Sequence, residues 1–460
     1  MRLVIVGGVA AGTKAASRAR RVDPGMEITV YQEEPEPSIS ECGLPYLLSG
    51  VVGRREELVA RTPERFAEQE IEVLVRHRVE RIDPRKKVLS VRDLATGEAF
   101  EDSYDRLIVA TGARAVLPPI PGADLDGVFK LRFLTDSDGV RRYMEERSPK
   151  RAVVVGGGYI GLEVAENLCR IGMEVSLIEG EDRVALAYGA EVSERVENHL
   201  RENGVRAYIG TKVEEFVGEG RIRGVRFGDA DLETDLVIVG VGISPCVDLA
   251  EEAGAEIGPT GAIRVDAHMR TTLPDVWAAG DCVETTNLVS GGPVWVPLGD
   301  TANQMGRVAG TNAASPAEHH ALEFPGVLGT GIFKVFGLGV GKTGLSEREA
   351  EVAGFEAVSA EVEVYDRAAY YPGAEKVFLK LIADKASGRL IGAESAGSGA
   401  DKLTDICATA LWGKLSYTDL VDIDLAYSPP YGPVLSPVIQ AATILSGKFE
   451  RAGQGVKASE

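Results

Sequence analysis

A complete G-x-G-x-x-G turn occupies residues 156–161 and directly follows the apolar run Ala152–Val155. The apolar run predicts a buried parallel strand, and the glycines allow a helix to begin close to a bound pyrophosphate. Glu179 ends the next apolar strand, where a carboxylate binds the ribose of NADH and repels the 2′-phosphate of NADPH. We therefore predict a Rossmann-like unit that prefers NADH, with Arg183 as the nearby cation that would admit NADPH.

A second glycine-rich turn lies near the start of the chain, between an apolar run and a helical segment. Gly7 and Gly12 take two of the three glycine positions, and Val9 replaces the middle one. The following strand ends in Gln32, with Glu33 next to it. This spacing predicts a second nucleotide-binding unit and leaves its ribose partner open.

A single cysteine, Cys42, follows this first unit and is preceded by Ser38, Ser40 and Glu41. Either serine could cap a helix that carries Cys42 in its first turn, where the helix dipole would favour the reactive thiolate. Glu41 would oppose that effect by raising the pKa of the thiol. The alternative interpretation is a small buried side chain without chemistry.

Lys14, Arg18 and Arg21 are spaced to lie on one face of the first predicted helix. They are either a solvated helix face or a site for an anionic ligand near Cys42. The net charge of −20 makes a local basic cluster more informative and makes nucleic acid an improbable partner.

Length and composition narrow the class of protein further. The chain has 460 residues, enough for about three domains. Its five cysteines form no C-x-x-C pair, so neither a disulfide scaffold nor a metal site is expected. We find no signal segment at the start and no apolar run of about 18 residues, so we expect a cytoplasmic protein without a membrane partner.

Two further apolar strands lead into Thr111-Gly112 and Gly242, and a third segment ends in Gly280-Asp281. Such strand ends face the ligand crevice of a parallel sheet. After about residue 328 no nucleotide motif recurs, and the pattern predicts a separate domain. Its expected elements are antiparallel strands at 331–336, 361–365 and 376–382 and a helix at 401–412.

Together these motifs resemble the pyridine nucleotide–disulfide oxidoreductases over nearly the whole chain. The resemblance implies an α/β fold with two doubly wound Rossmann-like domains and a C-terminal α+β dimerisation domain that forms a homodimer. It divides the chain into an FAD-binding domain in two parts (1–115 and 244–327), an NAD(P)H-binding domain (116–243) and the dimerisation domain (328–460). The residues implied for FAD are Gly7, Gly8, Ala10, Gly12, Gln32, Glu33, Thr111, Gly112, Gly280, Asp281 and Ala302. Those implied for the nicotinamide coenzyme are Gly156, Gly158, Tyr159, Ile160, Gly161, Glu163, Glu179 and Gly242.

Within this family the chain resembles the branch with one redox-active cysteine, because no C-x4-C pair and no late histidine–glutamate pair is present. That branch holds coenzyme A-disulfide reductases, NADH oxidases and peroxidases, and persulfide or polysulfide reductases. The turn lacks the histidine of the peroxidases, which speaks against that activity. Tyr427, in a Tyr-x-Pro-Pro motif, and Tyr371 are the implied catalytic tyrosines beside Cys42, with Tyr427 supplied by the other subunit. The substrate-binding residues implied are Lys14, Arg18, Arg21, Ser38, Asn303 and Tyr431.

The sequence therefore predicts an FAD-dependent NAD(P)H oxidoreductase that reduces a low-molecular-weight disulfide, persulfide or polysulfide. Among these substrates, coenzyme A-disulfide is favoured. Coenzyme A would be the substrate or a thiol bound to Cys42. One alternative is an NADH oxidase that reduces O2 through a Cys42 sulfenate. Another is a flavoprotein electron-transfer reductase in which Cys42 is structural.

Overall fold

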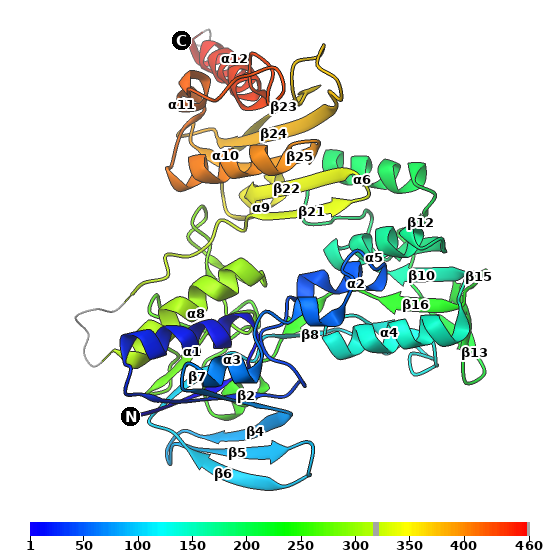
Figure 1. Ribbon diagram of the computed structural model, residues 1–460. Coiled ribbons are helices and arrows are strands. Elements are labelled where there is room, and N and C mark those ends of the chain that lie inside the picture. The colour runs from blue at the N-terminus through cyan, green and yellow to red at the C-terminus, as the bar shows by residue number, and fades with distance from the viewer. Residues whose placement is uncertain (316–321, 458–460) are drawn as a thin grey trace.

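The computed structural model describes residues 1–315 and 322–457. The fold is built around three five-stranded sheets (Figure 1). The first is a parallel sheet in the order β18-β7-β1-β2-β3. Its central strands are the apolar runs expected from the sequence and are buried on both faces. The strands are β1 (Arg2–Val6), β2 (Glu27–Gln32), β3 (Ile71–Val75), β7 (Arg106–Val109) and β18 (Val276–Ala278).

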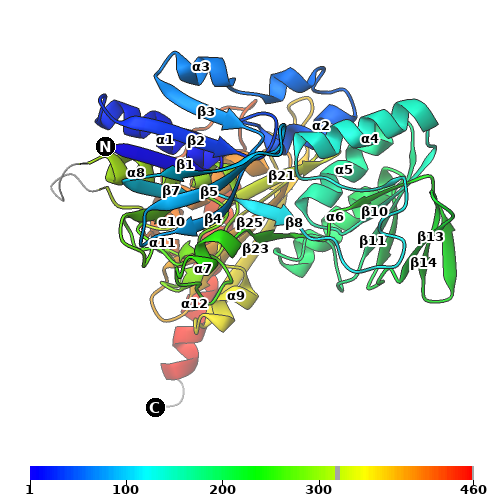
Figure 2. The ribbon, with the colours of Figure 1, turned by 90° about the horizontal axis from the view of Figure 1, so that it is seen from below.

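Helices α1 (Ala10–Val22) and α8 (Gly299–Ala314) pack side by side on this first sheet (Figures 1 and 2). Their contact is unusually close because α8 presents Gly306 and Gly310. A Cβ atom on either glycine would lie 2.3 Å from a backbone oxygen of α1, that of Ala11 or Ala15. An antiparallel sheet of β4 (His77–Asp83), β5 (Val88–Asp93) and β6 (Ala99–Ser103) lies next to this unit.

The second parallel sheet has the order β12-β11-β10-β16-β9. Helix α5 (Tyr159–Arg170) starts at the complete glycine turn and packs on its central strands. The strands are β9 (Val128–Lys130), β10 (Arg151–Val155), β11 (Glu174–Glu179), β12 (Arg206–Ile209) and β16 (Leu236–Val239). The accompanying elements are α4 (Leu134–Arg147), α6 (Ala190–Glu202) and the small sheet β13 (Glu215–Gly218), β14 (Ile222–Phe227) and β15 (Ala230–Glu233).

The third sheet is antiparallel, in the order β21-β22-β25-β24-β23, and is covered by α10 (Ala400–Trp412) and α12 (Pro437–Lys457). The three strands expected here are present, but the prediction omitted two more. The strands are β21 (Gly331–Val335), β22 (Leu338–Gly344), β23 (Ala357–Tyr365), β24 (Lys376–Asp384) and β25 (Leu390–Gly397). Shorter helices α9 (Glu347–Val352) and α11 (Tyr417–Asp422) complete the unit.

Two short antiparallel strands, β8 (Ala113–Ala115) and β17 (Ile243–Pro245), pair where the chain enters and leaves the second unit. The remaining short elements lie around the first unit, except that α2 packs on α4 and α5 of the second unit. They are η1 (Glu41–Gly43), α2 (Leu44–Leu48), η2 (Arg55–Leu58), α3 (Pro63–Ala67), α7 (Asp248–Glu252), β19 (Thr285–Thr286) and β20 (Pro293–Val294). Among the described residues, no helix is both long enough and apolar enough to cross a membrane.

Candidate active site

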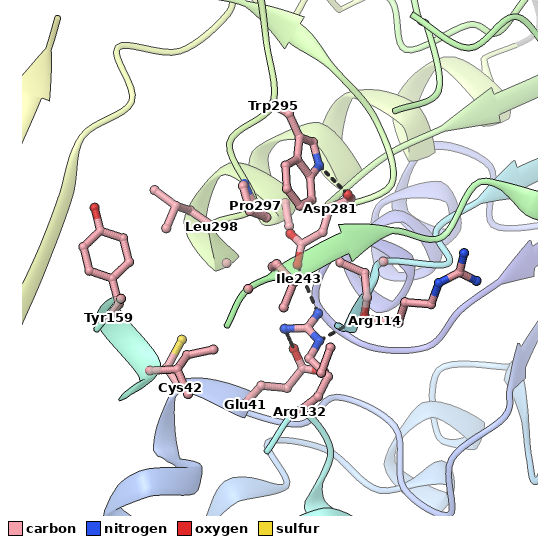
Figure 3. A pocket seen from close by; sticks show the side chains of 18 of the residues that line it. Glu41, Cys42, Arg114, Arg132, Tyr159, Ile243, Asp281, Trp295, Pro297 and Leu298 are labelled. Carbon is pink, nitrogen blue, oxygen red and sulfur yellow. Dashed lines mark hydrogen bonds and ion pairs between the residues drawn. The ribbon is translucent and has the colours of Figure 1, made fainter. Parts of the chain in front are cut away.

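A cavity of about 1890 Å³ runs between the two nucleotide turns and has Cys42 in its wall. Figure 3 shows Cys42 on one side of it and Asp281 and Trp295 on the other. Most of the residues predicted for FAD and for the coenzyme line this one cavity. Gly8, Gly12 and Gly161 do not line it, although they belong to the two turns.

The first turn is shaped by backbone contacts that only glycine permits. Gly7 has a φ of +105°, and a Cβ atom there would lie 2.0 Å from the carbonyl oxygen of Ala110. A Cβ atom on Gly12 would lie 1.8 Å from the oxygen of Gly7. These close approaches leave the beginning of α1 open to the cavity, where backbone N–H groups can face a phosphate.

Gln32 and Glu179 occupy equivalent places in the two units. Gly8 donates its backbone N–H to the amide oxygen of Gln32 at 2.7 Å, and Gly157 donates to a carboxylate oxygen of Glu179 at 2.6 Å. Gln32 thus takes the structural position of the carboxylate that the first unit lacks. Glu33 and Glu34, which follow it, both line the cavity, and Glu33 is paired with Arg78 at 2.6 Å.

The second turn differs from our expectation in its nearby cation. Arg183 does not line the cavity, and its nearest carboxylate is that of Asp182. Lys212 lines the cavity instead and packs against Gly180, where a Cβ atom would lie 3.3 Å from Lys212 Cγ. Lys212 follows β12 and lines the same cavity as Glu179, the carboxylate predicted to bind the ribose.

The environment of Cys42 contradicts the expected helix cap. Cys42 lies in the single turn η1, and neither Ser38 nor Ser40 caps it with a side-chain hydrogen bond. Ser38 instead has a left-handed φ of 56°, and its N–H donates to the oxygen of Gly8 at 2.7 Å. One 3₁₀ turn has too small a dipole to favour a thiolate.

The thiol of Cys42 faces the cavity, and the cavity walls raise its pKa by desolvation. The carboxylates of Glu163 and Glu41 raise it further, whereas Arg132 lowers it. The expected opposing effect of Glu41 is therefore confirmed, and the expected serine cap is absent, although a backbone hydrogen bond at Cys42 also lowers the pKa.

Arg132 lies between Glu41 and Asp281 and was absent from the sequence prediction. Its Nη1 is 2.9 Å from Glu41 Oε2 and its Nη2 is 3.1 Å from Asp281 Oδ2 (Figure 3). Burial raises the pKa of Asp281, and it raises that of Glu41 to about 7, with Arg132 acting against both shifts. Trp295 fixes the same region by donating its indole N–H to the carbonyl of Asp281 at 2.7 Å.

Glu163 and Tyr159 lie on α5 at the coenzyme end of the cavity. Tyr46 donates its hydroxyl to Glu163 at 3.2 Å, and burial raises the pKa of the Glu163 carboxyl to about 7. The ring of Tyr159 contacts those of Tyr188 and Phe333, with centroid separations of 6.1 and 5.1 Å. An aromatic side chain therefore stands where the second turn meets the C-terminal sheet.

A second cavity, of about 320 Å³, adjoins the first and is strongly basic. Lys14, Arg18 and Arg21 line it from α1, and Ser38 and Asn303, two further residues implied for substrate binding, also line it. Two cations that the sequence did not indicate complete its wall, Arg61 and Arg307. None of these five cations forms an ion pair with a carboxylate in the part of the chain that the structure describes.

The two cavities share part of their walls. The shared residues are Val9, Ala10, Ile39, Ser40 and Asn303. A ligand whose anionic end occupies the basic cavity can therefore extend along these residues to Cys42.

The late tyrosines lie apart from both cavities in this chain. Tyr427, Tyr371 and Tyr431 are 50%, 38% and 74% exposed. Their two loops touch, since the N–H of Ala368 donates to the oxygen of Pro429 at 3.2 Å. Within one chain the loops that carry these tyrosines thus meet each other, and the tyrosines line neither cavity.

Two nucleotide turns that face a thiol across one cavity define an oxidoreductase that moves electrons from a nicotinamide coenzyme. The family described as pyridine nucleotide-disulphide oxidoreductase matches residues 1–306, and the dimerisation domain of that family matches residues 331–437. The chain belongs to this family, and the predicted fold class is confirmed. Membership implies FAD and NAD(P)H as cofactors.

Relatives with several activities are similar over nearly the whole chain. A Pyrococcus abyssi protein named NAD(P)H sulfur oxidoreductase (CoA-dependent) is 36% identical, over 96% of this chain and 98% of that protein. A Methanocaldococcus jannaschii NADH oxidase is 33% identical (96% and 98%), and a Staphylococcus haemolyticus coenzyme A disulfide reductase is 31% identical (94% and 96%). The structure of an NAD-dependent persulfide reductase from A. fulgidus has a TM-score of 0.94 and 40% identity, over 98% of this chain and 84% of that one.

Proposed function

We propose that this enzyme uses NADH and FAD to reduce a disulfide, persulfide or polysulfide carried by coenzyme A, with Cys42 as the single redox-active residue. The observation that carries the proposal is the basic cavity beside Cys42. Coenzyme A has a pyrophosphate and a 3′-phosphate at one end and a sulfur at the other. Five cations that form no ion pair with any described residue suit the anionic end, in a protein of net charge −20. The wall shared by the two cavities would then place the sulfur near Cys42.

The residues of the larger cavity fit FAD. The open turn at Gly7, the partly buried carboxylate of Asp281 and the bare Cα of Gly280 meet along one wall. A Cβ atom on Gly280 would lie 2.8 Å from that of Ala11, so a side chain would disturb this wall. When bound, FAD supplies two-electron transfer between the nicotinamide and sulfur.

Cys42 would then form and break a bond to substrate sulfur. Its thiolate attacks one sulfur of R–S–S–R, which gives Cys42–S–S–R and releases R–S⁻. Two electrons from NADH reduce the mixed disulfide to Cys42–S⁻ and a second R–S⁻, so that one NADH and one proton yield two thiols. A hydroxyl group near the leaving sulfur would supply its proton, and we assign that role to Tyr427 of the partner in a homodimer.

The test compares acceptors and variants in steady-state assays with NADH. Coenzyme A-disulfide and coenzyme A persulfide should be reduced with much lower KM than glutathione disulfide, and Cys42→Ser should abolish both reactions. Oxygen consumption that exceeds disulfide reduction in the wild type would instead favour the NADH oxidase alternative. Turnover of an artificial electron acceptor by Cys42→Ser, with no disulfide activity in the wild type, would favour the electron-transfer reductase.

Variants of the basic cavity test the choice of coenzyme A. Arg61→Ala and Arg307→Ala should each raise KM for coenzyme A-disulfide roughly tenfold, because a charge-assisted phosphate contact contributes about 1.5–3 kcal/mol. Arg20→Ala is the matched control, since Arg20 is on α1 but binds the oxygens of Pro24 and Glu70 outside the cavity. Equal KM values in all three variants would contradict binding of coenzyme A here.

A further inference from the structure

We propose that Glu394 and Lys342, two buried residues of the C-terminal sheet, are positioning residues for the nicotinamide coenzyme. They hold the segment 185–189, which we call the coenzyme loop, at the wall of the cavity. The inference rests on the proposed use of NADH and adds a task for the C-terminal domain within its own chain.

The coenzyme loop is fixed at its start by the second nucleotide turn. Ala185 has a left-handed φ of 50°, and its N–H donates to the oxygen of Gly157 at 2.8 Å. Leu186 and Ala187, the next two residues, line the large cavity and are exposed. The left-handed φ of Ala185 is unusual for a residue other than glycine and persists only where surrounding contacts enforce it.

The end of the loop is held from the C-terminal sheet. Gly189, the residue before α6, donates its N–H to both carboxylate oxygens of Glu394, each at 3.0 Å. Lys342 donates its ammonium group to the oxygen of Ala187 at 2.9 Å. Glu394 and Lys342 come from neighbouring strands, β25 and β22, and α6 lies against these strands in Figure 1.

The two residues that hold the loop, Glu394 and Lys342, carry buried charges. Burial of a charge costs free energy unless the charged group has a defined partner. Glu394 is 1% exposed and Lys342 is 7% exposed. The carboxylate of Glu394 lies at the N-terminus of α6, where the helix dipole favours a negative charge. Lys342 is itself held by Glu349, whose carboxylate is 2.5 Å away and belongs to the capping box of α9.

Tyr188 gives the loop its connection to the coenzyme. It lies between the two held positions, and its ring packs against Tyr159 and against Phe333 of β21. Tyr159 lines the cavity at the beginning of α5. Release of Ala187 or Gly189 would therefore loosen both the cavity wall and the aromatic side chain that faces the coenzyme.

The simpler alternative is that these ion pairs merely join two domains. The structure offers a matched control for that alternative in Lys380, a lysine of the same sheet that is 3% exposed. Lys380 pairs with Glu191 of α6 and Glu347 of α9, at 3.1 and 2.5 Å, but donates to no atom of the coenzyme loop. A purely structural role predicts equal effects for Lys342→Met and Lys380→Met.

The experiment uses flavin-loaded protein and two readouts. In anaerobic rapid mixing, Lys342→Met should raise the Kd for NADH roughly tenfold and change the limiting rate of flavin reduction less than twofold. Glu394→Gln should raise the Kd less, because one amide oxygen can still accept from Gly189. Hydrogen exchange should become faster at the amides of 185–189 in both variants. Lys380→Met should change both readouts less than Lys342→Met, because Lys380 acts on the loop only through Glu394, its partner across the β24–β25 pair.

Gly189→Ala gives a third perturbation that keeps both charges. Its Cβ atom would lie 2.7 Å from Glu394 Oε2, so the carboxylate must move. The proposal is wrong if all three variants keep the wild-type Kd and exchange rates, or if Lys380→Met has the same effect as Lys342→Met. If NADH does not reduce the flavin of the wild type, the proposed function fails, and the exchange readout still decides whether Lys342 and Glu394 hold the loop.

Discussion

Arg132 holds the carboxylate of Glu41, with 2.9 Å between Nη1 and Oε2, and thereby fixes the residue that precedes Cys42. The same guanidinium holds Asp281 on the opposite side of the cavity. The loop of the reactive thiol and the loop expected to bind FAD thus share one cation. Burial is the main cause of the raised pKa of the Cys42 thiol, the carboxylates of Glu163 and Glu41 raise it further, and Arg132 lowers it.

Glu41→Gln should lower the pKa of Cys42. The ionised carboxylate disfavours the thiolate, and its removal also leaves Arg132 free to stabilise the thiolate, so both effects have the same sign. We therefore expect the pH profile of the thiol to move to lower pH. The rate of alkylation by iodoacetamide, measured against pH on the reduced protein, reports the shift. Glu57→Gln, a change at an exposed ion pair with Arg54, is the control and should leave the profile unchanged.

Glu163 should make stability depend on pH. Its pKa in the folded protein, about 7, is above the ordinary value of 4.5, so the folded state binds the proton more tightly than the unfolded state. The contribution of this group to stability is therefore complete below about pH 4.5 and is lost as the pH rises through 7, by up to about 3 kcal/mol. Denaturant unfolding of the wild type and Glu163→Gln at pH 5 and pH 8 should show the two free energies converging at the lower pH.

Gly306→Ala should destabilise the first nucleotide unit. Its Cβ atom would lie 2.3 Å from the oxygen of Ala11, so α8 and α1 must separate. We expect a loss of about 2–4 kcal/mol and weaker retention of flavin, measured by thermal unfolding and by absorbance after dialysis. Gly139→Ala in α4 is the matched control, because its Cβ atom would lie 3.7 Å from Phe129 and the change improves helix propensity. An unchanged unfolding temperature for Gly306→Ala would show that the two helices are not held at this distance.

The sequence predicted the parallel sheets well because their strands are uniform apolar runs bounded by glycine turns. It failed at β22 and β25, whose sequences, LGVGKTG and LIGAESAG, are rich in glycine and polar residues although most of their positions are buried. No local pattern distinguishes such strands from loops, because pairing with neighbouring strands determines their structure. The same limit applies to the sites: Arg61, Arg132 and Arg307 reach the cavities only through the tertiary fold.

Tyr427 should act in the partner's site if the dimerisation domain forms the expected homodimer. Cys42→Ser and Tyr427→Phe homodimers should both be nearly inactive with coenzyme A-disulfide. Mixed dimers should contain one site with both substitutions and one intact site, and so recover up to about half of the wild-type activity per dimer formed. Differently tagged subunits allow the mixed dimers to be isolated. Isolated mixed dimers without activity would show that Tyr427 does not act across the interface.

Lys212 should decide how well NADPH substitutes for NADH. Glu179 is held in place by the N–H groups of Gly157 and Glu181, at 2.6 and 2.8 Å, so its carboxylate cannot turn away from a 2′-phosphate without losing both bonds. Lys212 is exposed, lines the cavity and packs on Gly180 beside this carboxylate, where its ammonium group can reach the phosphate. Lys212→Met should therefore lower kcat/KM for NADPH about tenfold and leave that for NADH within a factor of two.

Added salt should produce the same selective loss of NADPH activity in the wild type, because an exposed ion pair is screened. Arg183→Met is the control and should affect neither coenzyme, because its side chain does not line the cavity. A loss of NADPH activity in Arg183→Met with none in Lys212→Met would show that Arg183, in the segment after β11, determines the coenzyme selectivity instead of Lys212.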